Sequence, residues 1–276
     1  MLLIDMKRVR YIYISEKINE GGTATVYLGV NLNTGFQVAV KEPLSYLYKN
    51  PHFKSLFIGE ANHYLELDHP NIVKLEDLIL DQDEGYLVME YVEGRNMREY
   101  IKEITGPLPF HNASLFLNEA LKAIGYTHNC GYVHMDIKPA NIMISNHDEI
   151  KVIDFGISLD TSKKFNTEVM GTPYYMSPEQ IIGKNIDSRS DIYSLGVTLF
   201  ELVTGKPPFA GADVSREELL ELVKTVSLPR VAPKNEFEKP MTGLINHIIQ
   251  KSTAKNPDDR YQNCEEFQED LMQIID

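Results

Sequence analysis

Four polar residues in the middle of the chain could do chemistry together. Asp136, Lys138 and Asn141 lie close together, and Asp154 follows after two short apolar runs. The apolar runs indicate buried strands, so the polar groups are expected on loops at strand ends, where active sites are commonly built. Asp136 could accept the proton of an attacking hydroxyl, and Lys138 could neutralise charge on a moving phosphoryl group. Asn141 and Asp154 offer oxygen ligands that suit magnesium rather than zinc, so these residues predict phosphoryl transfer from a metal-bound nucleotide.

This spacing resembles the catalytic loop and the metal-binding DFG motif of eukaryotic-type protein kinases. The usual loop is H-R-D-x-K-P-x-N; this chain has His134-Met135-Asp136-Ile137-Lys138-Pro139-Ala140-Asn141, followed by Asp154-Phe155-Gly156. Taken singly, each residue also fits an ordinary turn or a solvated loop. Taken together, they favour a kinase site. Lys138 and Gly171-Thr172-Pro173 resemble serine/threonine kinases rather than tyrosine kinases.

The whole chain has the composition of a soluble globular protein. Its 276 residues suggest one or two domains, with 43% hydrophobic and 24% charged residues. The sequence has no apolar run long enough for a membrane span and no signal-peptide pattern. The two cysteines, Cys130 and Cys264, match neither a disulfide framework nor a metal-binding spacing. We therefore expect a cytoplasmic protein. The net charge of −13 disfavours nucleic acid and anionic membranes as partners; it fits basic peptide substrates or simply a solvated acidic surface.

A turn near the start of the chain stands where kinases have a glycine-rich phosphate loop. Residues 11–20 and 25–31 predict two strands joined at Gly21-Gly22. The family pattern is G-x-G-x-x-G-x-V, but Asn19 and Ala24 occupy the outer glycine positions, and only Gly21 and Val26 match. Asn tolerates positive φ and Ala is small, so the loop could still cover phosphates. A plain hairpin turn is the alternative.

A lysine on the third strand needs a partner that holds it. Val38-Ala39-Val40-Lys41 matches the V-A-I-K element, and Lys41 resembles the lysine that binds the α and β phosphates. The helix expected over 54–67 offers Glu60 and Glu66, which point roughly 240° apart around its axis. The family spacing selects Glu60.

The resemblance also implies the remaining nucleotide contacts. Met89 would be the gatekeeper, and the backbones of Glu90 and Val92 would meet adenine. The implied nucleotide-binding residues are Asn19, Gly21, Val26, Ala39, Lys41, Met89, Glu90, Val92, Met143 and Asp154. Tyr64, Leu75, His134 and Phe155 would form a buried stack, although ordinary core packing explains Tyr64 and Leu75 equally well.

The segment after the DFG motif resembles an activation segment that ends in a substrate-facing platform. Residues 157–170 are polar and hydroxyl-rich, and Gly171-Thr172-Pro173 leads to Ser177-Pro178-Glu179, where the family has Ala-Pro-Glu. In the family Thr172 would bond the catalytic Asp and Lys. Met135 replaces the arginine that receives an activation-loop phosphate, and Glu168 stands near the usual phosphosite. We therefore expect activity without strong dependence on activation-loop phosphorylation, although Thr161, Ser162 and Thr167 could be autophosphorylated.

Two residues late in the chain are expected to be structural. Asp191 either closes a capping box with Ser188 or, as in the family, bonds the catalytic-loop backbone. Tyr193 replaces the usual Trp. Arg260 resembles the arginine that pairs with Glu179, and breaking such a buried pair from one side costs roughly 3 to 5 kcal/mol.

The fold expected from the resemblance is α+β and two-lobed, and it covers residues 11–275. The N-lobe, about 9–92, would hold a five-stranded antiparallel sheet plus a helix. A hinge at about 90–95 would lead to a mainly helical C-lobe, about 96–276, so that 1–276 is a single kinase domain with ATP between the lobes.

The function expected is transfer from ATP and Mg²⁺, or Mn²⁺, to Ser or Thr hydroxyls of protein substrates. A pseudokinase or ATP-binding scaffold is the alternative, supported by Asn19, Ala24 and Met135. The Gly-Thr-Pro and Ser-Pro-Glu motifs disfavour a kinase of small molecules, because a peptide-binding platform accounts for them better. The residues within the motifs resemble those of bacterial members of the family. The sequence does not distinguish regulation by a partner protein from regulation by a homodimer.

Overall fold

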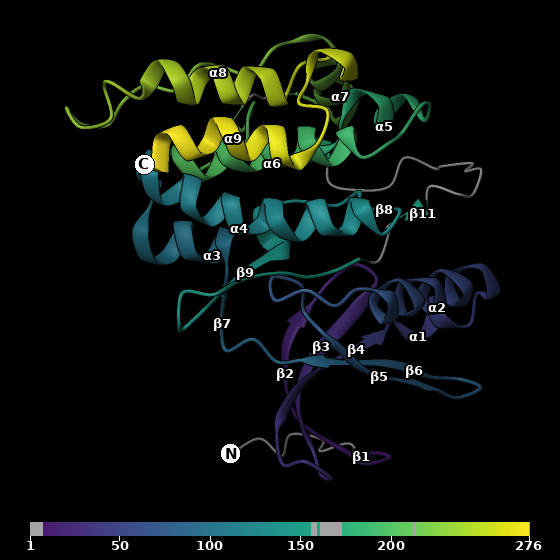
Figure 1. The fold of residues 1–276 in the computed structure, drawn as a ribbon. Helices are drawn as coiled ribbons and strands as arrows, with labels where there is room; N and C mark the ends of the chain where they lie inside the picture. The colour runs from purple at the N-terminus through teal and green to yellow at the C-terminus, as the bar shows by residue number, and fades with distance from the viewer. Residues whose placement is uncertain (1–7, 156–158, 161–172, 212–213, 276) are drawn as a thin grey trace. The chain divides into compact units, whose positions relative to one another are not determined.

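The computed structural model describes residues 8–155, 159–160, 173–211 and 214–275 (Figure 1). The chain forms two compact units. Unit 1 comprises Met1–Asp68 and Ile72–Glu93, and unit 2 comprises His69–Asn71 and Gly94–Asp276. Each unit has its own buried apolar residues, and the mixture of a sheet-rich and a helix-rich unit confirms the α+β fold class.

Unit 1 is built on one curled antiparallel sheet with strand order β1-β2-β3-β4-β6-β5. The strands are β1 (Arg8–Val9), β2 (Ile12–Glu20), β3 (Ala24–Asn31), β4 (Gln37–Pro43), β5 (Leu75–Leu80) and β6 (Gly85–Glu90). The five predicted strands are present, but the sheet has six strands rather than five. The extra strand, β1, is only two residues long and pairs with β2 across a turn in which Arg10 has φ 53°.

Successive side chains along β4 point to opposite faces of this sheet. Val38 and Val40 are buried in an apolar cluster. The other members of that cluster are Val9, Ile12, Ile14, Ile79, Tyr86 and Val88. Because successive side chains point to opposite faces, Ala39 and Lys41 lie on the other face of β4.

Two helices follow β4 in unit 1. The short α1 spans Ser45–Tyr48, and α2 spans Pro51–Glu66. Helix α2 begins three residues before the predicted start because the Asn50 side chain accepts hydrogen bonds from the N–H groups of His52 and Phe53, and Pro51 suits the first turn. Its buried residues are Phe57, Glu60, Ala61 and Tyr64, which share one face of the helix.

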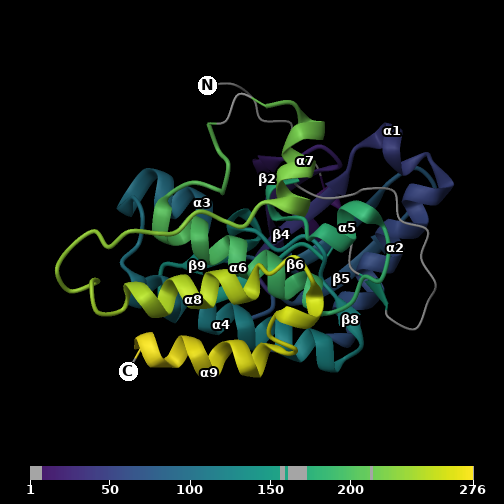
Figure 2. The same ribbon diagram turned by 90° about the horizontal axis from the view of Figure 1, so that it is seen from above.

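Unit 2 is mainly helical (Figures 1 and 2). Helix α6 (Arg189–Thr204) is the central element, because its residues 190–203 are all buried. It packs against α4 (Phe110–Asn129) and α8 (Thr242–Ser252), and α9 (Cys264–Ile275) packs against α4. The shorter helices are α3 (Met97–Glu99), α5 (Pro178–Ile182) and α7 (Arg216–Thr225). The first helical segment of unit 2 is α-helical only in α3 and continues as a π-helix over Tyr100–Thr105.

Short strands of unit 2 hold the segments that carry the chemistry. Strands β10 (Ile150–Val152), β9 (Ile142–Ser145) and β7 (Gly94–Asn96) form one sheet, and β8 (Tyr132–Val133) pairs with β11 (Leu159–Asp160). Gly94 is required in β7, since a Cβ there would lie 2.0 Å from the Ile144 carbonyl oxygen. The loop 134–141 therefore runs between β8 and β9, and Asp154 lies just past β10.

Candidate active site

The predicted catalytic residues of unit 2 gather around the carboxylate of Asp136. Lys138 Nζ donates to Asp136 Oδ2 at 2.5 Å, and Asn141 Nδ2 donates to the same oxygen at 3.0 Å and to the Asp136 carbonyl oxygen at 2.8 Å. The 3₁₀ turn Pro139–Asn141 brings Asn141 back to Asp136. Two donors thus orient one carboxylate oxygen, and this carboxylate is 15% exposed.

Asp154 is tied to the same loop through its neighbour Ile153. The Ile153 N–H donates to the Asn141 carbonyl at 2.9 Å, and the Ile153 carbonyl lies 3.2 Å from His134 Nε2. Asp154 itself has φ 67°, a left-handed conformation that is uncommon for a non-glycine residue. The next ring, Phe155, packs on His134 with centroids 4.5 Å apart.

Asn141 and Asp154 fit the metal role by donor type. Because Asn141 Nδ2 donates to Asp136, its Oδ1 is the atom that could bind a cation. An amide oxygen and a carboxylate are hard ligands, as magnesium prefers. Within the described ranges, no group of three or more His, Cys, Asp or Glu side chains could hold a metal ion. Two side-chain ligands would leave other positions around the cation for a ligand such as a nucleotide phosphate.

The carboxylate of Asp191 accepts hydrogen bonds from the backbone at the start of the catalytic loop. Its Oδ2 accepts from the His134 N–H and its Oδ1 from the Met135 N–H, both at 2.8 Å, and His128 Nε2 lies 2.8 Å from Oδ2. Ser188 at the start of α6 makes no side-chain cap. The capping-box interpretation of Ser188 with Asp191 is therefore wrong, and the bond to the catalytic loop is present.

In unit 1, Lys41 and Glu60 form a buried ion pair. Lys41 Nζ lies 2.7 Å from Glu60 Oε1, and their side chains are 13% and 5% exposed. Glu66, the alternative on the same helix, is exposed near its end. The ion pair holds the end of the Lys41 side chain in a fixed position on the sheet.

Five of the predicted nucleotide residues of unit 1 share one face of the sheet. The strand register pairs Lys41 with Val26, Ala39 with Met89, and Asn19 with Val26. Residues directly opposite in a ladder point to the same face, so all five lie on the face that carries Lys41. Glu90 ends β6, and Val92 follows before β7; Met143 lies on β9 in unit 2.

The turn at the predicted phosphate loop makes no strong steric demand for glycine. The Gly21 N–H donates to the Ala24 carbonyl at 2.9 Å. A Cβ at Gly21 would be 3.6 Å from that oxygen, an ordinary contact, and a Cβ at Gly22 would meet nothing within 4 Å. Asn19 uses its side chain locally, since its Oδ1 accepts from the Glu20 N–H at 2.8 Å.

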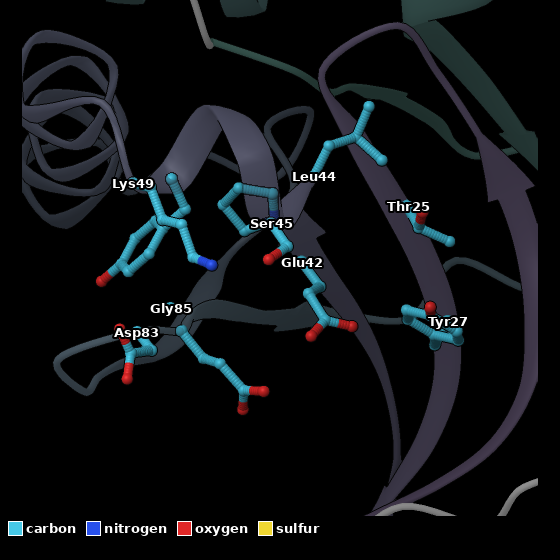
Figure 3. A pocket seen from close by; sticks show the side chains of 11 residues that line it. Thr25, Tyr27, Glu42, Leu44, Ser45, Lys49, Asp83 and Gly85 are labelled. Carbon is cyan, nitrogen blue, oxygen red and sulfur yellow. The ribbon is translucent and has the colours of Figure 1, made fainter.

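A pocket of about 470 Å³ lies elsewhere in unit 1 (Figure 3). Thr25, Tyr27 and Glu42 line it, and these residues alternate along their strands with Val26 and Lys41. The pocket therefore opens on the opposite face of the sheet, and none of the predicted site residues lines it.

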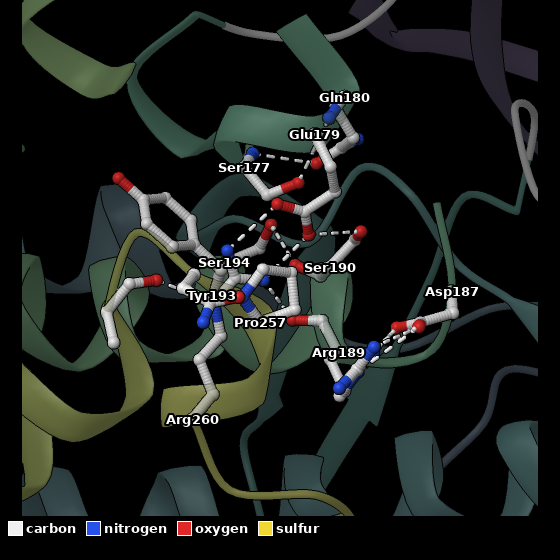
Figure 4. A network of polar contacts seen from close by, with 12 residues as sticks. Ser177, Glu179, Gln180, Asp187, Arg189, Ser190, Tyr193, Ser194, Pro257 and Arg260 are labelled. Carbon is white, nitrogen blue, oxygen red and sulfur yellow. Dashed lines mark hydrogen bonds and ion pairs between the residues drawn. The ribbon is translucent and has the colours of Figure 1, made fainter. Parts of the chain in front are cut away.

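A polar network joins α5 and α6 to the 3₁₀ turn Pro257–Asp259 (Figure 4). Arg260 donates to both carboxylate oxygens of Glu179, at 2.6 and 2.8 Å, and Ser190 Oγ donates to Glu179 at 2.7 Å. Burial alone would raise the pKa of Glu179, but the hydrogen bonds and charge of Arg260 hold that pKa below its ordinary value. The predicted pair is present, and the Arg260 side chain is fully buried. Tyr193, in place of the family Trp, lies with its ring 5.1 Å from the Arg260 guanidinium.

The comparison with protein families agrees with this geometry. The family model described as the protein kinase domain matches residues 12–272. The chain belongs to the protein kinase domain family. The resemblance predicted from the motifs is thereby confirmed.

Several bacterial serine/threonine-protein kinases are similar to this chain. The chain is 39% identical to the serine/threonine-protein kinase PrkC of Bacillus subtilis, with 98% of this chain and 41% of the relative covered. It is 37% identical to the serine/threonine-protein kinase PknB of Mycobacterium leprae (92% and 41% covered) and 36% identical to a probable serine/threonine-protein kinase of Clostridium acetobutylicum (95% and 39% covered). The chain thus spans about two fifths of the length of these relatives. Over the residues described, no helix combines the length and apolar character that a bilayer crossing requires.

Some predicted features of the kinase domain lie outside the described residues. These are Gly156, the segment with Thr161, Ser162, Thr167 and Glu168, and Gly171 with Thr172. The expected bonds of Thr172 and the phosphosites stay predictions. The stack of Tyr64 and Leu75 with His134 and Phe155 also stays a prediction as a whole, although each of the four residues is buried.

Two groups of residues near the platform were missed by motif reasoning. Tyr175 donates to the buried Glu201 and accepts from Arg98 at 2.6 Å, and burial raises the pKa of Glu201. The second is Gln180, whose side-chain amide donates to the backbone carbonyl of Met135 in the catalytic loop. The Ser177-x-x-Gln180 pattern could have predicted its capping role, but no local pattern indicates its contact with residue 135.

Proposed function

We propose that this kinase domain transfers the γ-phosphoryl group of ATP to serine and threonine hydroxyls of protein substrates. The observation that carries the proposal is the cluster in which Lys138 and Asn141 both donate to Asp136 Oδ2. A carboxylate held in this way is suited to orient a hydroxyl for in-line attack. The printed names of the bacterial relatives support serine and threonine as acceptors.

Each residue of the cluster has a proposed role in this reaction. Asp136 would accept the hydrogen bond of the substrate hydroxyl and later its proton. Lys138 would offset negative charge on the transferring phosphoryl group. In unit 1, Lys41 would hold the α and β phosphates, and its pairing with Glu60 at 2.7 Å would fix it for that role.

Asn141 and Asp154 would hold the divalent metal ion that the family implies. The ion, magnesium or manganese as a substitute, would supply positive charge to offset the negative charge of the nucleotide phosphates. Asn19, Val26, Ala39 and Met89 would line the nucleotide on the Lys41 face of the sheet, as their shared register supports. Gly21 would contribute from the turn between β2 and β3. The backbones of Glu90 and Val92 would meet adenine, and Met143 would contribute from β9.

Activation-loop phosphorylation would have little influence on this kinase domain. Met135 is 7% exposed and offers a thioether where the family has a guanidinium, so a loop phosphate would find no charged partner at that position. Regulation by a partner protein or by a homodimer stays compatible with this proposal.

An ATP-binding scaffold is the second candidate. The departures at Asn19, Ala24 and Met135 favour it. The retention of every other catalytic motif residue weighs against it, namely Lys41, Glu60, Asp136, Lys138, Asn141 and Asp154. The scaffold would bind ATP without transferring phosphate.

The test is transfer from γ-labelled ATP to a basic protein with magnesium, using wild type and Asp154→Asn. We expect wild type to label Ser and Thr and Asp154→Asn to lose about 100-fold or more, as for groups that act on transition-state charge. Asp148→Asn, the same change at an exposed turn residue of unit 2, is the matched control and should label like wild type. If wild type binds ATP but labels nothing, the scaffold function is correct instead.

A further inference from the structure

We propose that Gln180 is a positioning residue for phosphoryl transfer, which acts by holding the backbone of Met135 and so orienting Asp136. The proposal rests on the proposed role of Asp136. It concerns a contact between α5 and the catalytic loop that the kinase motifs do not specify, and every residue in it belongs to unit 2.

The backbone of Met135 adopts a strained conformation directly before Asp136. Its φ is 72°, in the left-handed region that favours glycine. Such a conformation costs a long side chain free energy and persists only where the surroundings fix it. Met135 cannot relax without turning the peptide group that carries Asp136, so whatever fixes Met135 also sets the direction of Asp136.

Two side chains from different helices hold the two peptide groups of Met135. The Met135 N–H donates to Asp191 Oδ1 of α6 at 2.8 Å. The Met135 carbonyl accepts from Gln180 Nε2 of α5 at 2.9 Å. Asp191 therefore restrains the peptide group before Met135, and Gln180 restrains the one after it, which leads directly into Asp136.

Gln180 is itself fixed at the start of α5 (Figure 4). Its Oε1 accepts from the Ser177 N–H at 2.8 Å, and its own N–H donates to Ser177 Oγ at 3.3 Å, which completes a capping box. The Gln180 side chain is buried, with 4% exposed. The amide thus uses its oxygen for the helix and its nitrogen for the catalytic loop.

Because the amide oxygen and the amide nitrogen have different partners, Gln and Glu are not equivalent at position 180. A capping box accepts either residue, because either supplies the oxygen that the N-cap N–H needs. An ionised Glu has no donor for the Met135 carbonyl and would place negative charge beside it. The contact to Met135, rather than the helix cap, therefore requires Gln. It links the end of the platform to the catalytic loop without the arginine that the family places at position 135.

The experiment is a double-mutant cycle in the full chain. Gln180→Glu keeps the cap and removes the donor, and Gln180→Met removes both. Each is made alone and together with Met135→Gly, because glycine adopts φ near 70° without strain, so Gln180 no longer has to oppose strain at that position. Glu218→Met, which removes the exposed partner of the Ser215 capping box in α7, is the matched control. Steady-state kcat, KM for ATP and melting temperature are measured for all variants.

We expect Gln180→Glu and Gln180→Met to lower kcat about tenfold or more, since small misplacements of a reacting group are costly, while KM for ATP stays within about twofold. In the Met135→Gly background, the same changes should lower kcat by less than about threefold. Glu218→Met should leave kcat unchanged.

Two results would overturn the proposal. The first is wild-type kcat for both Gln180 variants. The second is a loss of kcat that is equally large in the Met135→Gly background, which would assign Gln180 a general structural role. If Gln180→Met fails to fold, Gln180→Glu decides, because its cap is intact. Asp136→Asn is assayed in parallel: if it keeps full kcat, the proposed function fails, whereas loss of its activity with full activity of both Gln180 variants rejects only the present inference.

Discussion

The ion pair of Lys41 with Glu60 can be separated experimentally from the rest of helix α2. We expect Glu60→Gln to lower kcat/KM for ATP about tenfold or more, because Lys41 loses the charge that fixes it. We also expect it to destabilise the protein by about 1 to 3 kcal/mol, the cost of weakening a buried charged hydrogen bond. Kinetic assays and urea unfolding measure both effects.

Glu66→Gln is the matched control, since Glu66 is exposed on the same helix. It should behave as wild type within about 0.5 kcal/mol. Equal losses in the two variants would mean that Glu60 is not the functional partner of Lys41.

The Glu179 carboxylate predicts a dependence of stability on pH. Its pKa lies below the ordinary value of 4.5 in the folded chain, because the effect of Arg260 outweighs the effect of burial. The unfolded state then takes up a proton first, so the free energy of unfolding contributed by this group is complete above pH 4.5 and falls as the pH drops through the folded pKa.

Glu179→Gln should therefore lose stability near neutral pH, by roughly 3 to 5 kcal/mol, and show a shallower decline in acid than wild type. Urea unfolding at a series of pH values from about 7 down to the acid limit gives both quantities. Parallel curves for the two proteins would show that Glu179 does not titrate as stated.

At the scale of single residues, the sequence predicted the partners that kinase motifs specify. Asp136 with Lys138 and Asn141, and Glu179 with Arg260, are close together as expected. Gln180 was missed for a physical reason: its contact with residue 135 depends on where the chain returns in space and on the φ of Met135. Neither quantity is encoded in a local pattern.

Helix caps provide a test at the scale of elements. Ser215 accepts from the Glu218 N–H and begins α7, whereas Ser188 at the start of α6 makes no side-chain cap. We expect Ser215→Ala to lower the free energy of unfolding by about 1 kcal/mol and Ser188→Ala to change it by less than about 0.5 kcal/mol. Urea unfolding compares the two serines directly. A larger loss at Ser188 would restore the capping-box interpretation for α6.

Elements with a long apolar period were predicted best. Helix α9 (Cys264–Ile275) is an example from the C-lobe, which was expected to be mainly helical, since Phe267, Leu271 and Ile274 mark one clear face. The early start of α2 was missed because it depends on the cap at Asn50 rather than on apolar spacing. The two residues of β1 are too few to show alternation, and the π-helix after α3 has no signal in residue type.

At the scale of the whole molecule, the proposed machinery is divided between the two units. Lys41 and Glu60 belong to unit 1, and Asp136, Asn141 and Asp154 belong to unit 2. The order of motifs along the chain predicts a division of these residues between an N-lobe and a C-lobe. The curled sheet and the buried α6 explain it, because each unit forms its own core around the residues that it positions.

The proposed independence from activation-loop phosphorylation is tested on the complete kinase domain. We expect a phosphatase-treated preparation to retain about half or more of its initial rate, because the buried Met135 offers no charged group to a phosphate. Initial rates before and after treatment, with removal of phosphate verified by intact mass, provide the measurement. Loss of nearly all activity that returns on incubation with ATP would contradict this expectation.

The most direct test of the account is the rate of phosphoryl transfer by Asp136→Asn at saturating ATP and magnesium. Asn at this position keeps the shape of the side chain but cannot accept the hydroxyl proton. We predict that kcat for transfer to serine or threonine falls about 100-fold or more, while the Kd for ATP with magnesium stays within about threefold of wild type. An unchanged kcat would show that Asp136 does not orient the acceptor and would contradict the account.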